Sequence, residues 1–221
     1  MKTIAIIPAR GNSKRLPNKN VKLLSGLPLL AYSIKYAKQH DFVAAVYVTT
    51  DNEEVKKVAL DYGAIVIDRP KELSGDFEPT VTALKHVLEF IRDKVENVIL
   101  LQPTNPLRPK HLLNSAFEAY SLNKCDSLFT VSRNRDKFGT IENQKFKPYN
   151  YAIGQRSQDL MPLYSENGLL YITKANYIIN QEIITSDAYP FIVNHPFGTL
   201  DIDFLDDFDL AEFMVKKYYD E

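Results

Sequence analysis

Cysteine is scarce in this 221-residue sequence, and long apolar segments are missing from it. The single cysteine, Cys125, excludes an intrachain disulfide framework and fits a reducing compartment. No run approaches the ~20 apolar residues of a membrane span, and the apolar run before Pro8 is too short for the core of a signal peptide. We therefore expect a cytoplasmic protein that does not bind membranes.

A large net charge is also missing, because 27 lysines and arginines nearly balance 28 acids and leave −1. Near neutrality argues against a general role in binding nucleic acid. The charges are unevenly placed, however: residues 1–40 hold eight basic residues and no acid, and residues 199–221 hold eight acids and two lysines. If these basic and acidic segments meet in the folded protein, they would suit one site that binds phosphates on its basic side and a metal on its acidic side. Two separate solvated faces would give the same pattern.

Several common catalytic signatures are absent as well. The sequence has neither G-x-x-x-x-G-K-[ST] nor G-x-G-x-x-G, which argues against a kinase-type P-loop and a dinucleotide-binding fold. The four histidines lack metal-ligand spacing, and no Cys–His or G-x-S-x-G signature supports a covalent nucleophile.

Strand-like and helix-like segments alternate over the first half of the sequence. Short apolar runs predict buried strands, and apolar residues at helical spacing predict helices. The strands are expected at Ile4–Ile7, Val46–Thr50, Ala64–Ile67 and Val98–Leu101, and the helices at Pro28–Gln39, at Thr80–Arg92 and from Pro109 to Tyr120. This order predicts an α/β fold, a Rossmann-like, mainly parallel sheet sandwiched by helices.

Two helix starts have more specific predictions. Asp51 and Glu54 have the spacing of a capping box, so Asp51 is expected to cap the helix after the second strand. A last helix is expected at Leu205–Tyr219, after a last strand, with Asp206 as its cap.

From about residue 127 to residue 146 the helical period disappears, and polar and aromatic residues are mixed. This segment predicts an antiparallel excursion with a long loop, a pattern typical of an oligomer arm or a substrate lid. The sequence has no internal repeat and no clear second domain. We therefore expect residues 1–221 to form a single domain, with a dimerisation or substrate arm at about residues 127–170.

A strongly basic loop directly follows the first predicted strand. Its cations are Arg10, Lys14, Arg15 and Lys19, and the backbone N–H groups of residues 11–13 can come close to an anion. Open α/β sheets bind their ligands at the carboxyl ends of the strands. The loop therefore predicts a binding site for a nucleoside triphosphate.

Two further segments carry polar residues at predicted strand ends. Prolines flank Thr104 and Asn105 and would hold Gln102 and Thr104 at the end of the fourth strand, although a rigid connection alone would explain these prolines. In an extended backbone, Asp201 and Asp203 point to the same side. Two carboxylates on one face repel unless a cation lies between them, and Mg²⁺ prefers a few carboxylates plus phosphate oxygens.

Four motifs resemble, in family order from Ile4 to Asp203, those of the acylneuraminate (CMP-sialic acid) cytidylyltransferases. They are A-R-G-N-S-K-R-L-P-N-K-N at 9–20, Q-P-T-N-P-L-R at 102–108, R-S-Q-D-L-M-P with E-N-G-L-L-Y at 156–171, and D-I-D at 201–203. The family usually has serine where this sequence has Asn105.

The resemblance implies a nucleotidyltransferase that transfers CMP from CTP to the anomeric hydroxyl of a nonulosonic (sialic-type) acid and releases pyrophosphate. It also implies Mg²⁺ (or Mn²⁺) as cofactor and a homodimer in which Arg156 and Lys137 reach the sugar carboxylate in the neighbouring subunit. The implied catalytic residues are Arg10, Lys19, Asp201 and Asp203, the last two also being the metal ligands. The implied nucleotide-binding residues are Ala9, Arg10, Gly11, Asn12, Ser13, Lys14, Lys19, Asn20, Arg69 and Thr80. The implied sugar-binding residues are Gln102, Thr104, Lys137, Arg156, Glu166, Asn167 and Tyr171.

Two alternatives stay open. A 3-deoxy-manno-octulosonate cytidylyltransferase would share the sheet and the basic loop, although Lys19-Asn20 fits the acylneuraminate pattern. A catalytically silent nucleotide-binding protein is the other alternative, and the presence of both Asp201 and Asp203 argues against it. The sequence does not identify the particular nonulosonic acid.

Overall fold

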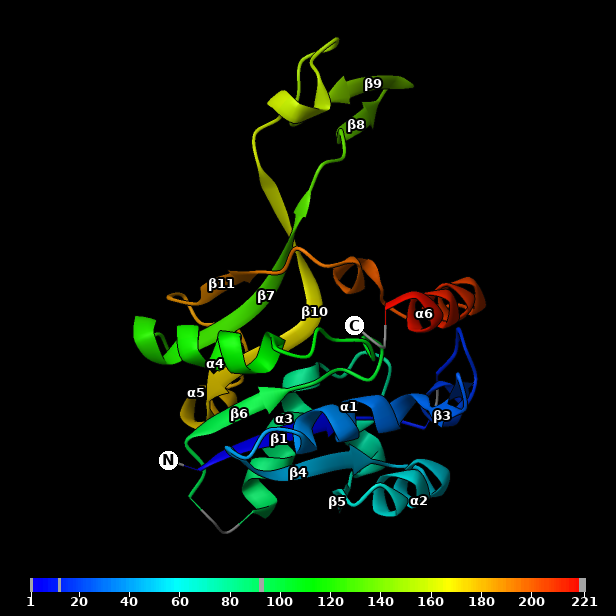
Figure 1. Cartoon of the computed structure of the whole chain (residues 1–221), viewed down its shortest axis with the longest axis vertical. Coiled ribbons are helices and arrows are strands. Elements are labelled where there is room, and N and C mark those ends of the chain that lie inside the picture. Colours follow the sequence, from blue (N-terminus) through cyan, green and yellow to red (C-terminus); the bar gives the residue numbers. More distant parts are fainter. Residues whose placement is uncertain (1, 12, 92–93, 219–221) are drawn as a thin grey trace.

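The computed structural model describes residues 2–11, 13–91 and 94–218, so the prediction for Asn12 lies outside the described residues. Within them, seven strands form one sheet in the order β11-β7-β10-β6-β1-β4-β5 (Figure 1). These strands are β1 (Thr3–Pro8), β4 (Val43–Thr50), β5 (Ile65–Asp68), β6 (Asn97–Leu100), β7 (Ser127–Asn134), β10 (Leu163–Lys174) and β11 (Tyr189–Ile192). Only β10 runs antiparallel to its neighbours β6 and β7, so this sheet is mainly parallel, as predicted.

Helices cover both faces of this sheet. The core on one face receives side chains from four helices, α1 (Leu29–Lys38), α2 (Glu53–Asp61), α4 (Leu112–Asn123) and α6 (Leu205–Tyr218). The core on the other face receives side chains from α3 (Thr80–Phe90) and α5 (Ala175–Ile179). Along β1, Ala5 and Ile7 belong to the first core, and Ile4 and Ile6 belong to the second. A strand buried on both faces needs apolar residues at every position, which explains its continuous apolar run. The predicted α/β sandwich is confirmed.

The predicted cap of α2 is wrong. Asn52, not Asp51, occupies the N-cap position, and its side chain accepts a hydrogen bond from Val55 N at 3.0 Å. Asp51 instead accepts a hydrogen bond from the backbone N–H of Gly11 at 2.9 Å. Because asparagine caps a helix about as well as aspartate, the carboxylate of Asp51 is available to hold the basic loop.

Two other helix starts also differ from prediction. α4 begins at Leu112 rather than at Pro109, after a turn at residues 110–111. Asp206 lies inside the first turn of α6, and the carboxylate that binds the backbone before this helix belongs to Asp207. Arg92 and Tyr219, the predicted last residues of α3 and α6, lie outside the described residues.

Residues 135–162, called the arm below, project from the sheet between β7 and β10 (Figure 1). The arm contains the antiparallel pair β8 (Gly139–Glu142) and β9 (Lys145–Pro148), which together with the antiparallel β7–β10 pair matches the predicted antiparallel excursion. Several of its large apolar side chains are exposed: Phe138, Ile141, Phe146, Tyr149, Ile153 and Met161.

Short elements complete the described structure. A small hairpin of β2 (Leu23–Leu24) and β3 (Leu27–Pro28) precedes α1. The 3₁₀ helices are η1 (Lys19–Val21), η2 (Lys71–Leu73), η3 (Ser157–Asp159) and η4 (Pro196–Thr199). Of the described helices, none is both long and apolar enough to cross a membrane.

Candidate active site

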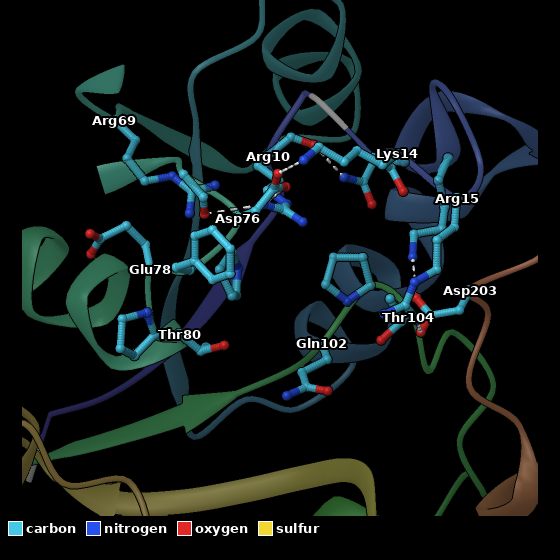
Figure 2. Close-up of a pocket in the computed structure, with 18 of the residues that line it drawn as sticks. Arg10, Lys14, Arg15, Arg69, Asp76, Glu78, Thr80, Gln102, Thr104 and Asp203 are labelled. Carbon is cyan, nitrogen blue, oxygen red and sulfur yellow. Dashed lines mark hydrogen bonds and ion pairs between the residues drawn. The ribbon is translucent and has the colours of Figure 1, made fainter. Parts of the chain in front are cut away.

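A cavity of about 580 Å³ opens at the carboxyl ends of the parallel strands (Figure 2). Its walls come from four separate parts of the chain: the loop after β1, the segment between β5 and α3, the turn after β6, and the segment before α6. Arg10 and Asp203 both line it, although they lie near opposite ends of the sequence. The predicted meeting of the basic loop with the acidic segment is therefore observed.

Lys19 and Arg15 contact the acidic segment directly. Lys19 is buried on η1, and its Nζ donates hydrogen bonds to Ile202 O at 2.7 Å and to Asp203 Oδ1 at 3.0 Å. Arg15 forms an ion pair with the other carboxylate oxygen of Asp203. The basic loop thus holds Asp203 at the edge of the cavity from two sides.

Other residues of the basic loop hold its backbone in shape. Asn20 lines the cavity and donates a hydrogen bond from Nδ2 to Arg10 O at 2.8 Å. The N–H of Gly11 is already bonded to Asp51, and a Cβ at Gly11 would meet Asn52 Cβ at 2.5 Å. The Gly11 N–H is therefore directed to Asp51 rather than to the cavity, and the lack of a side chain at Gly11 permits close packing against Asn52.

Ala9 and Ser13, two other predicted nucleotide-binding residues, differ in whether they line the cavity. Ala9 is buried, does not line the cavity, and donates its N–H to Thr49 O at 3.0 Å. Ser13 lines the cavity beside Lys14. Of the predicted nucleotide-binding positions at the start of the loop, Ser13 therefore faces the cavity, whereas Ala9 supports the strand.

Asp76 is a residue of this cavity that the sequence did not reveal. It lies between η2 and α3, and its Oδ1 accepts a hydrogen bond from Arg10 NH1 at 2.9 Å. Lys14 forms an ion pair with its other oxygen, and Figure 2 shows these contacts at the cavity wall. The hydrogen bond and charge of Lys14, together with Arg10, lower the pKa of Asp76 below its ordinary value. Asp76 is therefore charged at neutral pH.

Arg69 and Thr80 lie on the side of the cavity away from Arg15 and Asp203 (Figure 2). Arg69 is buried, and its NH2 donates to Thr49 O at 3.2 Å, while its Nε has no hydrogen-bond partner within the described residues. Burial lowers the pKa of this guanidinium, although nearby Asp51 opposes the shift. A buried donor without a partner is costly, and this Nε is such a donor in a residue of the cavity wall.

A second cavity of about 700 Å³ adjoins the first and shares Gln102 with it. It contains most of the predicted sugar-binding positions, namely Gln102, Glu166, Asn167 and Tyr171, and also Asp201. Thr104 lines the first cavity instead. A third cavity of about 340 Å³ also has Gln102 in its wall, together with Glu166, Tyr171 and Thr80.

Glu166 and Tyr171 act as a pair, because the Tyr171 hydroxyl donates a short hydrogen bond to Glu166 Oε1. Burial and this carboxylate raise the pKa of Tyr171, so the hydroxyl keeps its proton. Asn167 is buried and directs its amide to the protein, accepting from Thr130 Oγ1 at 2.6 Å and donating to Ser132 Oγ at 3.0 Å. Asn167 therefore shapes the second cavity more than it offers a free amide.

The turn after β6 connects the two cavities. Asn105 is buried and donates from Nδ2 to Asn167 O at 3.2 Å and to Leu200 O at 2.7 Å. Ile202 N donates to Thr104 O at 2.8 Å. The turn therefore fixes the β10 segment and the Asp201–Asp203 segment in place, so it is more than a rigid link.

Arg108 stabilises this turn through hydrogen bonds of its side chain. Its guanidinium is buried and donates to Leu169 O at 2.6 Å, to Ser33 Oγ at 3.0 Å and to Gln102 O at 3.0 Å. Burial lowers its pKa to about 10, so it stays charged at neutral pH.

Asp201 and Asp203 flank Ile202, which is fully buried. Asp203 lines the first cavity and Asp201 the second. Burial of its carboxyl raises the pKa of Asp201, and the charge of Asp203 adds to this shift. Within the described residues there is no group of three or more acids, histidines or cysteines that could hold a metal ion. Two carboxylates still fit Mg²⁺, which commonly completes its coordination with substrate phosphates and water.

Arg156 and Lys137 lie on the arm and line none of these three cavities. Arg156 Nε pairs with Asp159 Oδ2 at 2.7 Å, and Lys137 donates to Gln155 O. Within one copy of the chain, Arg156 and Lys137 therefore do not lie in a cavity with the other predicted site residues. Arg133 and Arg135, which the sequence did not single out, do line the second cavity.

Comparison with known proteins identifies relatives over nearly the whole chain. A cytidylyltransferase family model matches residues 4–219. An N-acylneuraminate cytidylyltransferase from Streptococcus agalactiae is 35% identical over 94% of this chain and 52% of its own length. The chain thus spans about half the length of the first acylneuraminate relatives.

Other relatives match over almost their full length. A pseudaminic acid cytidylyltransferase from Campylobacter jejuni is 31% identical, and a CMP-N,N'-diacetyllegionaminic acid synthase from Legionella pneumophila is 32% identical, each over 98% of this chain and 97% of the relative. A solved CMP:2-keto-3-deoxy-manno-octonic acid synthetase in complex with CTP has the same fold, with a TM-score of 0.73, 15% identity, and coverage of 98% of this chain and 99% of that one. The chain belongs to the cytidylyltransferase family.

Proposed function

We propose that this protein transfers CMP from CTP to the anomeric hydroxyl of a nonulosonic acid. The anomeric oxygen forms a bond to the α-phosphorus and gives up its proton to water, and the bond between the α-phosphorus and the oxygen bridging to the β-phosphate breaks to release pyrophosphate. The observation that carries the proposal is a basic cavity joined to a second cavity at Gln102, with Asp203 and Asp201 at their edges. The relatives that match along their whole length are named for activating pseudaminic and legionaminic acids.

The first cavity would hold CTP. Arg10, Lys14 and Lys19 supply fixed positive charge for the triphosphate, with Ser13 and Asn20 beside them. Arg69, whose buried Nε has no partner within the described residues, and Thr80 would contact the nucleoside on the far wall. Charge fixed in place before the reaction stabilises the charge that develops on the transferred phosphoryl group.

Asp201 and Asp203 would hold Mg²⁺ (or Mn²⁺) together with phosphate oxygens. The bound ion would supply Lewis-acid polarisation of the α-phosphate and charge compensation for the leaving pyrophosphate. Lys19 keeps the Asp203 carboxylate at the cavity edge through its buried hydrogen bond, so the ligand is oriented before any ion binds.

The second cavity would hold the acidic sugar. Gln102 and Thr104 lie between the two substrates, and Glu166 with Tyr171 offers a fixed acceptor for sugar hydroxyls. Glu166 and Asp201 make this cavity partly acidic, and Arg133 and Arg135 in its wall offer cations to an acidic sugar.

Arg156 and Lys137 of a second copy would add further cations to this site. They are too far along the arm to line their own cavities, and the arm exposes apolar side chains such as Ile141 and Ile153 that a second copy would cover. We therefore propose a homodimer in which each arm reaches the partner's sugar site. We also propose that it works in the cytoplasm, where its single cysteine would stay reduced.

A product screen tests the proposal. Purified protein is incubated with CTP and Mg²⁺ and, separately, with N-acetylneuraminic, pseudaminic, legionaminic and 3-deoxy-manno-octulosonic acids. Pyrophosphate release and mass spectrometry of the CMP-sugar report turnover. We expect a CMP-nonulosonate product. Turnover of the octulosonate alone would favour a relative of the solved synthetase, and CTP binding without turnover of any sugar would favour a silent nucleotide-binding protein.

A further inference from the structure

The carboxylate of Asp76 occupies the two cations that the proposed function assigns to CTP phosphates. Arg10 NH1 contacts Asp76 Oδ1 at 2.9 Å and Gly75 O at 3.1 Å, and Lys14 contacts the other oxygen of Asp76. All four residues line the first cavity (Figure 2). The bonds therefore link the loop after β1 to the segment between β5 and α3 across the wall of the nucleotide cavity.

These ion pairs are poorly placed to stabilise the fold. The side chain of Lys14 is 79% exposed, and that of Asp76 is 30% exposed. Exposed pairs of this kind contribute little to stability, because water screens them and long side chains lose freedom. Next to Asp76, Phe77 is fully exposed, so this part of the segment makes few packing contacts. The contacts can therefore be exchanged without disturbing the core.

Resting on the proposed function, we infer that Asp76 is an internal competitor for the nucleotide phosphates and sets how tightly the enzyme holds CTP and pyrophosphate. A phosphate that binds Arg10 and Lys14 has two possible relations to Asp76. If Asp76 moves away, both of its ion pairs are lost; if it stays, its negative charge repels the phosphate. Each case weakens phosphate binding, so the sign of the effect does not depend on which one holds.

The same contacts bear on product release. When pyrophosphate leaves, Asp76 can pair again with Arg10 and Lys14, which compensates the two cations that the product had neutralised. A permanent internal anion thus lowers affinity for the substrate and for the leaving product together. An enzyme that holds a multiply charged product against several fixed cations gains turnover from such weakening.

The test compares Asp76→Asn with Glu78→Gln. Asparagine keeps the size of aspartate and removes its charge. Glu78 lines the same cavity on the same segment, but no ion pair or hydrogen bond of its side chain is found among the described residues. Both variants change the net charge by one, so their difference isolates the contacts of Asp76 from the general field. Titration calorimetry with pyrophosphate, CTP and cytidine, at two salt concentrations, gives the affinities.

We expect Asp76→Asn to bind pyrophosphate and CTP roughly three- to tenfold more tightly than the parent protein, with cytidine affinity unchanged. Glu78→Gln should change phosphate affinity less, and the gain in Asp76→Asn should shrink at high salt. In turnover, pyrophosphate should inhibit Asp76→Asn at lower concentrations. Unchanged or weaker pyrophosphate binding in folded Asp76→Asn, or an equal gain in Glu78→Gln, would overturn the inference.

The outcome separates this inference from the function on which it rests. If the parent protein binds neither pyrophosphate nor CTP, the phosphate site itself is wrong and both proposals fail. If the parent binds both and turns over a nonulosonic acid while Asp76→Asn shows no gain, the role of Asp76 alone is wrong.

Discussion

Lys19 donates a hydrogen bond from its buried ammonium group to Asp203 Oδ1 at 3.0 Å, although 184 positions separate the two residues in sequence. This contact joins the loop after β1 to the segment before α6 at the edge of the first cavity. It therefore places a fixed cation beside one of the two carboxylates proposed to hold the metal.

Replacing Asp203 tests the catalytic half of the site. We expect Asp203→Asn to lower kcat by about two to three decades with folding intact, since it removes one fixed charge from the reacting centre. Asp209→Asn is the matched control, because Asp209 lies exposed on α6 and does not line the cavity. Steady-state kinetics and circular dichroism on both variants provide the check. Near-normal turnover of well-folded Asp203→Asn would refute the metal assignment.

Arg156 tests the proposed dimer. Arg156→Ala should raise the KM for the sugar much more than the KM for CTP, because the guanidinium is proposed to bind the sugar carboxylate. Lys145→Ala, another charge removed from the arm, serves as control. An unchanged sugar KM in Arg156→Ala would remove the proposed role.

Mixing variants shows whether Arg156 acts across the subunit boundary. Arg156→Ala and Asp203→Asn are unfolded and refolded together, so that mixed dimers form. A mixed dimer has one site with an intact core and an intact partner arm, so activity should return to about a quarter of the parent value if subunits pair at random. No recovery in a sample that sediments as a mixed dimer would place Arg156 in its own subunit's site.

Arg108 should matter for stability, because its guanidinium donates hydrogen bonds to two buried oxygens and one partly buried oxygen. Arg108→Met fills similar volume but leaves those acceptors without a donor, and we expect it to destabilise the protein by about 2–4 kcal/mol. Arg133→Met, at an exposed position, should change stability by less than about 0.5 kcal/mol. Urea unfolding followed by circular dichroism measures both. Equal midpoints for the two variants would contradict the structural role of Arg108.

Asp201 should show a conflict between stability and activity. A carboxyl with a raised pKa in the folded protein binds protons more readily there than in the unfolded chain, so stability falls as pH rises through that interval. At pH 7 its charge therefore destabilises the fold. Because Asp201 is exposed to solvent, Asp201→Asn should raise Tm by no more than about 1 °C at pH 7, with the gain shrinking near pH 4, while turnover is lost. A lower Tm at pH 7 would show that the carboxylate stabilises the fold.

Much of the fold could be predicted because its signals are local. A strand covered on both faces needs an unbroken apolar run, and Ile4–Ile7 has one. Helix starts were less predictable: Asp51 and Asn52 are both good caps, and only the approach of Gly11 decides which of them the helix uses. After Pro109 a turn precedes the helix, and the sequence could not show this because proline is compatible both with a turn and with the first position of a helix.

The charged residues of the site could be predicted where several of them lie together in a sequence motif. They could not be predicted where a single charged residue comes from a segment without a motif. The basic loop and Asp203 were identified, and they meet. Asp76 was missed because it is a single acid in an ordinary polar loop, and its partner Arg10 is 66 positions away. Asn167 was expected to line the sugar pocket and does line the second cavity, but its hydrogen bonds with Thr130 and Ser132 depend on strand register that no single-sequence pattern encodes.

The position of Gln102 in the walls of three cavities limits how substrate preference can be altered. A substitution there would reshape the proposed nucleotide and sugar cavities simultaneously, so selectivity for one substrate could not be tuned without disturbing the other. Arg133 and Ser165 border only the second of these cavities. If the second cavity binds the sugar as proposed, efforts to change the preferred sugar should therefore begin at Arg133 and Ser165.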